Sequence, residues 1–332
     1  MAGDRWMYRA CVLCLLLVSS ISRASGAGGG PASGLSFDYY SRTCPQVEQV
    51  IKAVMVEKQR EAFVTAAGTL RIFFHDCFVS GCDASVLVAS TLNNKAEKDA
   101  EDNLSLPGDG FDAVLRAKIA VEKVCPGVVS CADILAITTR DLVGLVGGPF
   151  WPVLKGRKDA RVSKASMVAG NLPQPNMSVD QLTRLFQQRG FSRDEMVILS
   201  GAHTVGFAHC EVFLNRIYGV KQDPTINRTF AQQLRFSCPN VNLDPTVVAF
   251  NDVTTPKKFD NVYFSNLQHG LGLMASDQIL WTDARTRSTV AKFAQSQASF
   301  FNAWVLAMQK LSLVGVKTGD EGEVRRRCEA VN

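Results

Sequence analysis

The chain has 332 residues, and 46% of them are hydrophobic, which is enough to bury one large core or two small ones. Its formal net charge is +5, and residues 1–27 contribute three arginines and one aspartate to that total. The rest of the chain is therefore only mildly basic, and its single run of basic residues is 325–327, so we expect no nucleic-acid partner.

Residues 1–27 have the pattern of a secretory signal peptide. Arg5 and Arg9 precede a short apolar run at 10–18, and small residues follow at 24–27. The apolar run is too short to span a bilayer, so we expect a secreted protein without a membrane partner, and a signal anchor is the alternative. Residues 28–34 form a flexible, glycine-rich lead-in, and 35–332 are expected to form a single domain.

Eight cysteines remain once the two in the predicted signal peptide, Cys11 and Cys14, are set aside. An even number behind a secretory signal predicts four disulfides, although eight cysteines allow about a hundred pairings. A zinc site fits poorly, because the sequence contains no CxxC pair and no histidine at zinc-finger spacing from these cysteines.

Helical periodicity dominates the rest of the chain and predicts an all-α fold. Ser130 is a predicted N-cap, and the pairs Ser178/Gln181 and Ser192/Glu195 are predicted capping boxes. In chain order we expect helices from Cys44-Pro45, over 63–77 and 111–124, from Ser130 to Gly147, from Ser178 to Gly190, from Ser192 into His203, and over 259–267, 285–295 and 298–311. Loops are expected at 93–110 and 171–176, and a short strand at Trp151–Arg157.

The stretch 70–85, LRIFFHDCFVSGCDAS, combines an apolar helix with residues that carry chemistry. Arg71 and His75 are four residues apart and share one helix face, where burial is costly without a task or a partner. A satisfied core histidine beside a surface arginine is the alternative. On another predicted helix His203 follows Gly201 and Ala202, small residues that would let a flat cofactor approach the backbone. The two histidines suit a haem held between two helices, with one axial ligand and one catalytic base.

Several motifs together resemble those of the secreted plant (class III) haem peroxidases. They are LRIFFHDCFVSGCDAS, SCADILAI, GRKDA, NLPQP, LSGAHTVGFAHCEVFLNRIY, TTPKKFDN and GLMASDQ, which occur in the family's order over about residues 35–330. The resemblance implies an all-α, two-part fold with minor short β-strands and one haem b between a distal and a proximal helical half. It also implies a monomer that reduces hydrogen peroxide and oxidises small phenolic reductants in one-electron steps, as in cell-wall cross-linking, auxin or defence chemistry and oxidative stress.

The resemblance assigns the distal roles residue by residue. His75 would be the acid–base group, Arg71 would stabilise the charge that builds as the O–O bond breaks, and Asn103 would accept the other imidazole proton. Glu97 would be the next member of that hydrogen-bond chain, and Phe74 would form a wall of the haem site. For Asn103, an ordinary turn-forming loop residue is the alternative.

On the proximal side His203 resembles the iron ligand and Asp277 its carboxylate partner, which would raise the basicity of the ligand. A helix cap is the alternative for Asp277. Pro173 resembles the proline whose carbonyl receives aromatic donors. His209 and His269 have no motif role and are read as surface or second-layer residues.

Two calcium sites and four disulfides are also implied by the resemblance. The first site would use Asp76, Asp83 and Ser85 with the carbonyls of Val79 and Gly81, and the second would use Thr204, Asp252, Thr255 and Asp260 with the carbonyl of Lys258. Loop caps are the alternative for Asp76 and Asp83. The implied disulfides join Cys44 to Cys125, Cys77 to Cys82, Cys131 to Cys328, and Cys210 to Cys238, and a buried ion pair is implied between Asp133 and Arg157.

The sequence departs from the family pattern at two places near the site. The usual SLRGF reads SLPGDGF at 105–111, and Asn251 stands where many members have an apolar or aromatic residue. Sequons for N-glycosylation occur at Asn103, Asn176 and Asn227, and we expect Asn103 to be unmodified because a glycan would exclude its pocket role. A non-catalytic haem protein and a Ser-His-Asp hydrolase are the alternative classes. The intact Arg71/His75/Asn103 set disfavours the first, and the lack of a GxSxG elbow disfavours the second.

Overall fold

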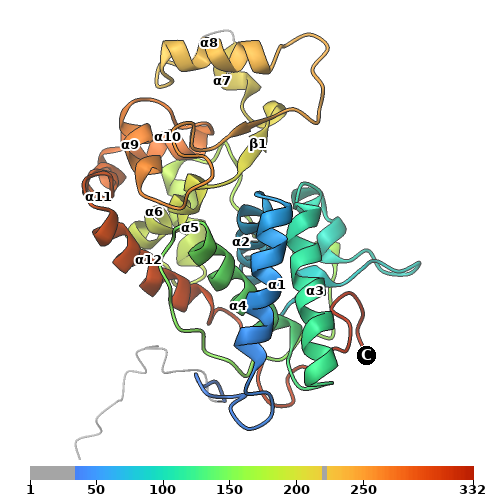
Figure 1. The fold of residues 1–332 in the computed structure, drawn as a ribbon. Helices are drawn as coiled ribbons and strands as arrows, with labels where there is room; N and C mark the ends of the chain where they lie inside the picture. The colour runs from blue at the N-terminus through green and yellow to red at the C-terminus, as the bar shows by residue number, and fades with distance from the viewer. Residues whose placement is uncertain (1–33, 219–222) are drawn as a thin grey trace, which may run out of the picture. The chain divides into compact units, whose positions relative to one another are not determined.

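The computed structural model describes residues 34–218 and 223–332, so the predicted signal peptide and residues 28–33 of the lead-in lie outside the described residues. The described residues form twelve α-helices, six short 3₁₀ turns and one two-stranded sheet, in agreement with the predicted all-α class (Figure 1). None of the helices in these two ranges is both long and apolar enough to cross a membrane.

The first helical group consists of α1 (Val47–Glu61), α2 (Thr65–Val79), α3 (Gly108–Val124) and α4 (Cys131–Leu145). α1 and α2 both pack against α3 and α4, and Figure 1 shows α1 and α3 running side by side. α2 and α3 approach each other closely, because a Cβ on Gly110 would stand 2.8 Å from the main chain of Gly68. α4 is buried along nearly its whole length, and Ser130 caps it by accepting a hydrogen bond from the amide of Asp133.

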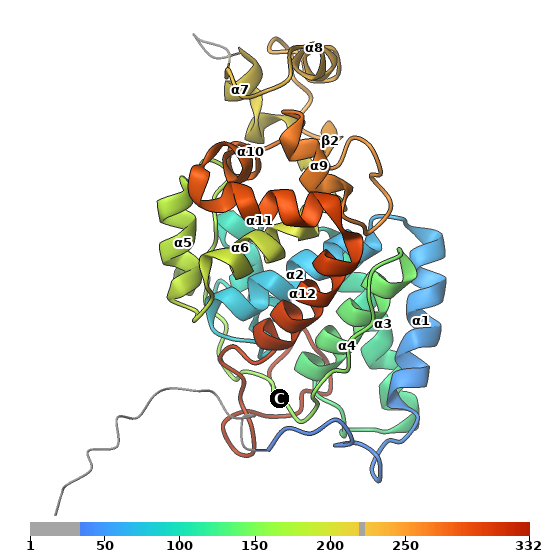
Figure 2. The same ribbon diagram turned by 90° about the vertical axis from the view of Figure 1, so that its left-hand side faces the viewer.

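The second helical group consists of α5 (Val179–Gln187), α6 (Arg193–Ser200), α9 (Val262–Gln268), α10 (Ala275–Thr282), α11 (Ala284–Gln295) and α12 (Gln297–Leu311). α11 packs against α6, α9 and α10, and α12 packs against α6 (Figure 2). The aromatic rings of Phe259, Phe264, Phe293, Phe300 and Trp304 contact one another inside this group. Both predicted capping boxes, at the starts of α5 and α6, are present.

A smaller part of the chain lies beyond the second group and has its own apolar core. It contains β1 (Phe207–His209), α7 (Leu214–Tyr218), α8 (Arg228–Ser237) and β2 (Val248–Phe250), and the strands pair antiparallel with Ala208 opposite Ala249. Figures 1 and 2 both place α7 and α8 at the end of the molecule next to the sheet.

Four disulfides are present, and they join the same cysteines as the resemblance implies: Cys44–Cys125, Cys77–Cys82, Cys131–Cys328 and Cys210–Cys238. The implied ion pair is also present. Arg157 Nη1 lies 2.9 Å from Asp133 Oδ1, and both side chains are fully buried. Because Tyr40 and the amide of Gly156 donate to the second carboxylate oxygen of Asp133, the buried charge is well hydrogen-bonded.

The structure differs from the predicted secondary structure at several places. The stretch Trp151–Arg157 is not a strand, because it forms one isolated bridge, between Lys155 and Ser36, and Gly156 has a φ of +115°. The predicted loop at 93–110 contains two 3₁₀ turns, Glu97–Asp99 and Glu101–Asn103, and its last residues already begin α3. The helices α7, α8 and α10 were not predicted.

Candidate active site

On the distal side, α2 presents His75 to the 3₁₀ turn that ends at Asn103. His75 Nδ1 lies 2.7 Å from Asn103 Oδ1, and the Asn103 amide nitrogen donates to the main-chain carbonyl of Glu97 at 2.7 Å. A carbonyl only accepts, so this second bond fixes the orientation of the amide and makes Asn103 Oδ1 the acceptor. His75 Nδ1 therefore carries the proton, and Nε2 has a free lone pair.

Burial, reinforced by the Arg71 guanidinium one turn away, lowers the pKa of His75 to about 3, although the bond to Asn103 acts in the opposite direction. The ring is thus uncharged at neutral pH and able to accept a proton. Arg71 itself is held by Ser105, with Nη1 2.8 Å from the carbonyl oxygen and Nη2 3.0 Å from the hydroxyl.

Glu97 joins the hydrogen-bond chain through its main chain rather than its carboxylate. The carboxylate instead accepts hydrogen bonds from the hydroxyls of Ser80 and Ser85, both at 3.0 Å. This side chain is fully buried, and burial raises the pKa of Glu97 to about 7. The Glu97 carboxylate therefore interacts with the loop after α2 and forms no hydrogen bond with the imidazole of His75.

The Phe74 ring lies next to His75, and the segment of Pro173 contacts the turn of Asn103. The Phe74 ring stacks on Phe78, with centroids 4.1 Å apart, and both rings contact Phe186 of α5, so these aromatics join the two helical groups. The segment of Pro173 is tied to the Asn103 turn because the side-chain amide of Gln174 donates to Asp102 at 2.8 Å.

On the proximal side, His203 lies in a 3₁₀ turn, Gly201–Thr204, that directly follows α6. Its Nδ1 lies 2.7 Å from Asp277 Oδ1 at the start of α10, and Tyr263 Oη donates to the same oxygen at 2.9 Å. The second oxygen of Asp277 accepts from the amide of Met274, so the carboxylate also caps its own helix. Asp277 therefore makes both the expected contact with His203 and the contact of a helix cap.

The helix predicted to run into His203 ends at Ser200, and Gly201 directly follows it. A Cβ on Gly201 would stand 2.7 Å from the ring of Phe300 and 3.0 Å from that of Phe264. Glycine is therefore needed here for the close packing of α9 and α12.

The two histidines fit the expected haem. Each ring has its Nδ1 held by a side-chain oxygen, and its Nε2 forms no hydrogen bond with any residue that the structure describes. The His203 side chain is 37% exposed although Asp277 is 2% exposed, so its free nitrogen faces open space rather than the core. An imidazole with one nitrogen held by a carboxylate and the other free is the usual arrangement of a metal-ligating histidine.

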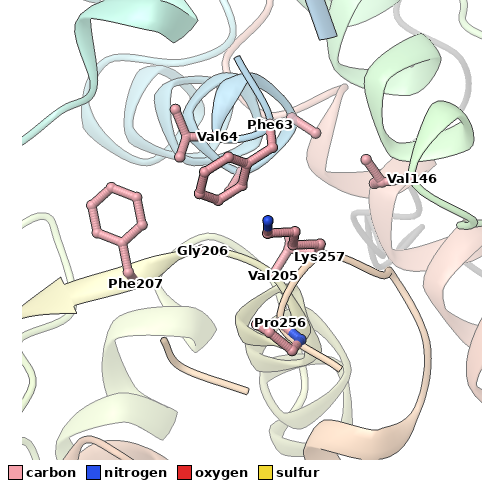
Figure 3. Close-up of a pocket in the computed structure, with 10 residues that line it drawn as sticks. Phe63, Val64, Val146, Val205, Gly206, Phe207, Pro256 and Lys257 are labelled. Carbon is pink, nitrogen blue, oxygen red and sulfur yellow. The ribbon is translucent and has the colours of Figure 1, made fainter. Parts of the chain in front are cut away.

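Figure 3 shows a small apolar cavity where the start of α2 meets the segment after His203. Phe63 and Val64 line it from one side, and Val205, Gly206 and Phe207 from the other. Its volume is about 10 Å³, which leaves no room for a ligand. Lys257 closes the cavity with its ammonium 4.3 Å from the centroid of the Phe63 ring.

The expected first calcium site lies directly after α2, where the Cys77–Cys82 disulfide ties the loop to the helix end. Asp76, Asp83 and Ser85 are buried together, and Gly81 accepts from the amide of Asp83 at 2.7 Å. Burial and the neighbouring charge of Asp83 raise the pKa of Asp76 well above its usual range. The amides of Ala84 and Val86 also donate to Asp76, as in the loop-cap alternative.

The expected second calcium site lies where the turn of His203 meets the loop before α9. Thr204 Oγ1 has three oxygens within 3.5 Å: Asp252 Oδ2, Asp260 Oδ1 and the carbonyl of Lys258. Thr255 Oγ1 lies 3.1 Å from the same Asp260 oxygen. A hydroxyl has one proton to donate, so these converging oxygens exceed the donors available and fit a hard cation.

Each of the two expected calcium sites contains only two carboxylates. In the two described ranges no group of three or more His, Cys, Asp or Glu side chains is placed to hold a metal ion. Each expected site pairs two aspartates with hydroxyl and carbonyl oxygens, the mixed set that calcium accepts.

Two residues of the site were missed by sequence reasoning. Tyr263 shares the Asp277 oxygen with His203, and its ring lies at 87° to the imidazole with centroids 6.2 Å apart. Ser105 anchors Arg71. Ser105 is the first residue of the departing SLPGDGF segment, which was the one available signal; for Tyr263 the sequence offered none, because the contact spans two helices.

Comparison with known proteins identifies the family. Residues 47–296 match the family model described as "Peroxidase". The chain is 50% identical to Peroxidase 63 of Arabidopsis thaliana over the full length of both proteins. It is 52% identical to Peroxidase 65 over 97% of this chain and 94% of that protein, and 53% identical to Peroxidase 41 over 91% and 92%, both from Arabidopsis thaliana. The chain therefore belongs to the peroxidase family as a class III plant peroxidase, a family that implies haem and the hydrogen-peroxide-dependent oxidation of reducing substrates.

Proposed function

We propose that the enzyme oxidises small phenolic compounds in one-electron steps, with His75, Arg71 and Asn103 carrying out the reduction of hydrogen peroxide. Two matched contacts support this proposal most strongly. His75 Nδ1 is held by an amide oxygen and His203 Nδ1 by a carboxylate oxygen, each at 2.7 Å. One imidazole is thereby prepared as a neutral base and the other as a strongly donating ligand.

His203 would hold haem b through Nε2. When bound, the haem supplies the iron that takes two oxidising equivalents from hydrogen peroxide and passes them one at a time to the donors. His75 Nε2 takes one proton from hydrogen peroxide and returns it to the departing oxygen, which leaves as water. Arg71 stabilises the negative charge that develops on that oxygen during cleavage. Asn103 keeps the proton on Nδ1, so the reacting nitrogen stays basic.

The carbonyl of Pro173 would receive the hydroxyl of a phenolic donor at the edge of the site. The tie between Gln174 and Asp102 supports this placement, because it holds the proline segment against the turn of Asn103. Two calcium ions would stiffen the loops that follow His75 and flank His203. We further propose a secreted monomer that carries glycans at Asn176 and Asn227, which are exposed, and none at Asn103, which is 2% exposed.

The test is purified protein reconstituted with haem. We expect a Soret band and hydrogen-peroxide-dependent oxidation of guaiacol, both lost in His203→Ala. His269→Ala is the matched control, because that exposed ring contacts only the carbonyl of Ser265. Retention of both the Soret band and turnover in His203→Ala would contradict the assignment of the ligand.

A further inference from the structure

Three carboxylates are buried around the loop of the first expected calcium site. Asp76 is 1% exposed, and Asp83 and Glu97 are fully buried. Each repels its neighbours, since Asp83 and Glu97 both act on Asp76. With no cation bound, carboxylates buried this close together need a positive counter-charge.

Such a counter-charge comes from the C-terminal part of the chain. Lys317 forms an ion pair with Asp83 Oδ2, and the other oxygen of Asp83 accepts from the amide of Ser85 at 3.0 Å. The Lys317 side chain is 29% exposed. Across residues 34–218 and 223–332 no other lysine or arginine forms an ion pair with any of these three carboxylates.

Main-chain contacts fix the position from which Lys317 reaches the loop. Its carbonyl accepts from the amide of Lys158 at 2.8 Å, and the carbonyl of Val314 accepts from the amide of Cys82 at 2.8 Å. Gly81 and Gly315 approach so closely that a Cβ on Gly81 would stand 2.3 Å from the Gly315 carbonyl oxygen.

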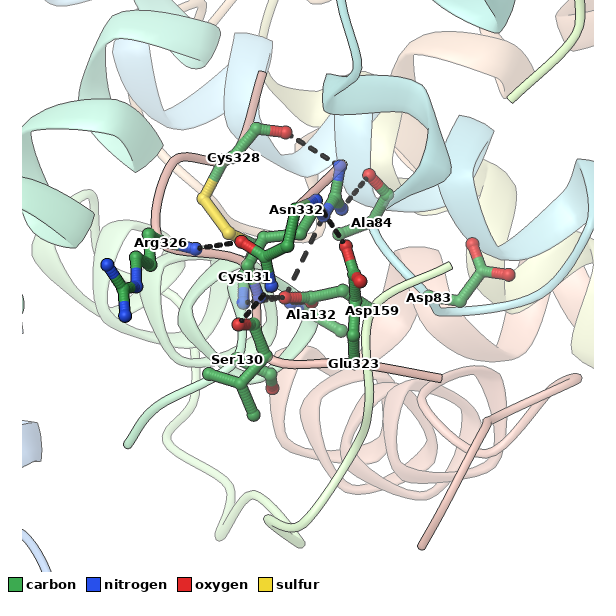
Figure 4. A network of polar contacts seen from close by, with 12 residues as sticks. Asp83, Ala84, Ser130, Cys131, Ala132, Asp159, Glu323, Arg326, Cys328 and Asn332 are labelled. Atoms are coloured by element: carbon green, nitrogen blue, oxygen red, sulfur yellow. Dashed lines mark hydrogen bonds and ion pairs between the residues drawn. A yellow bond between two sulfur atoms is a disulfide. The ribbon is translucent and has the colours of Figure 1, made fainter. Parts of the chain in front are cut away.

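Figure 4 shows the rest of this attachment. The buried guanidinium of Arg325 donates to the carbonyls of Ala84 and Cys328, and its amide donates to Asp159. The Cys131–Cys328 disulfide closes the same network. The C-terminal segment that carries Lys317 is therefore attached to the rest of the protein on both sides of this residue.

We propose that Lys317 is a built-in counter-ion that competes with calcium for the loop after α2. It stabilises the metal-free loop by pairing with Asp83, and it weakens calcium binding because a positive charge on a calcium ligand repels the incoming cation. The inference rests on the proposed first calcium site. Because Asp83 is fully buried, water screens the repulsion between the ammonium and calcium poorly. Removing the ammonium should therefore tighten calcium binding by about tenfold or more.

The second expected calcium site provides an internal contrast. Its nearest ammonium, that of Lys258, stands 3.5 Å from Asp260 Oδ2, and the Lys258 side chain is 63% exposed. Water screens such a charge, so its effect on calcium is small. Changing Lys317 should thus alter the release of one calcium ion and leave that of the other unchanged.

The test compares Lys317→Met, which keeps the apolar stem, with Lys317→Arg, which keeps the charge. Lys310→Met is the matched control, because it removes an ammonium paired with Glu195 on the outer side of α12. Calcium content by plasma mass spectrometry and the rate of release to a chelator are measured on haem-loaded protein, together with thermal unfolding with and without chelator.

We expect Lys317→Met to release one of two calcium ions about tenfold more slowly and to unfold at a lower temperature than wild type only after chelation. Lys317→Arg and Lys310→Met should match wild type in calcium release. Equal or faster release from Lys317→Met would overturn the inference while leaving the calcium sites standing. Wild-type protein without bound calcium would instead overturn the proposed sites, and the inference with them. If Lys317→Met fails to fold, Lys317→Gln replaces it.

Discussion

The two imidazoles of the active site are held in nearly the same way by chemically different partners. His75 meets a neutral amide and His203 a carboxylate, in both cases through Nδ1 at 2.7 Å. The amide leaves His75 uncharged and ready to carry a proton, whereas the carboxylate gives the ring of His203 anionic character and makes it a stronger donor to a metal. One side chain type thus serves two tasks because its neighbour differs.

The charges around the two imidazoles also differ. His75 is 8% exposed, and its pKa is lowered by this burial and by a guanidinium one turn away. The carboxylate beside His203 accepts a second hydrogen bond from Tyr263, and the same environment raises the pKa of Tyr263 well above its usual range through burial and the charge of Asp277. The distal side therefore disfavours an additional positive charge, and the proximal side holds a stable negative one.

The largest expected effect comes from removing the distal base. His75→Ala should slow the reaction with hydrogen peroxide by about 10²–10⁴-fold, because general acid–base catalysis contributes that much. Stopped-flow absorbance at the Soret band measures this step directly. The variant should still bind haem, since His203 is untouched; a variant that loses its haem would argue that His75 and not His203 is the ligand.

The next largest loss of peroxide reactivity is expected when the amide partner of His75 is replaced by a carboxylate like that of His203. Asn103→Asp places a carboxylate beside His75 Nδ1, which favours the charged ring and raises its pKa. At neutral pH we expect the peroxide reaction to slow by about tenfold or more. The conservative variant Asn103→Gln retains a neutral acceptor and serves as the control. An unchanged rate in Asn103→Asp would show that the amide partner is not needed to keep His75 neutral.

The pH profile of the wild-type enzyme tests the same point without a substitution. The pKa of His75 in the folded protein, about 3, lies below its ordinary value of 6.5, so the ring stays neutral as the pH falls between them. The peroxide rate constant should therefore remain flat from pH 7 to pH 5 and fall only as the pH approaches about 3. Because unfolded chains bind this proton below about 6.5, the same group lowers folding stability over that interval. A rate that halves near pH 6.5 would contradict the buried, neutral state.

The smallest expected effect concerns Tyr263. Tyr263→Phe removes one of two hydrogen bonds to Asp277 Oδ1, so the remaining bond to His203 strengthens and the iron becomes harder to reduce. We expect a more negative midpoint potential in redox titration and a change in the peroxide rate of less than about threefold, since the distal groups are intact. A more positive potential would mean that Tyr263 does not restrain the carboxylate.

Local signals in the sequence predicted the features that depend on neighbouring residues. The capping boxes of α5 and α6 and the cap at Ser130 are present because each needs residues only three positions apart. The strand predicted at Trp151–Arg157 is absent because its main chain forms only an isolated bridge with the distant residue Ser36 and does not pair with a neighbouring strand.

Contacts between distant residues were also the ones that could not be predicted in the active site. The resemblance placed His75, Asn103, His203 and Asp277 in pairs that the structure brings within hydrogen-bonding distance. It did not indicate Tyr263 or Lys317, because each acts through a contact made only in the folded chain. Lys317 lies 234 residues from Asp83, and no sequence pattern connects them.

The central claim is that the partner of each imidazole decides its task, and the iron–imidazole stretching band of the reduced, haem-loaded enzyme tests it most directly. Resonance Raman spectra would be compared for wild type, Asp277→Asn and Asn103→Asp. We predict a lower stretching frequency in Asp277→Asn, because the ligand loses its anionic character, and an unchanged frequency in Asn103→Asp. A band that shifts in Asn103→Asp and stays unchanged in Asp277→Asn would contradict the account.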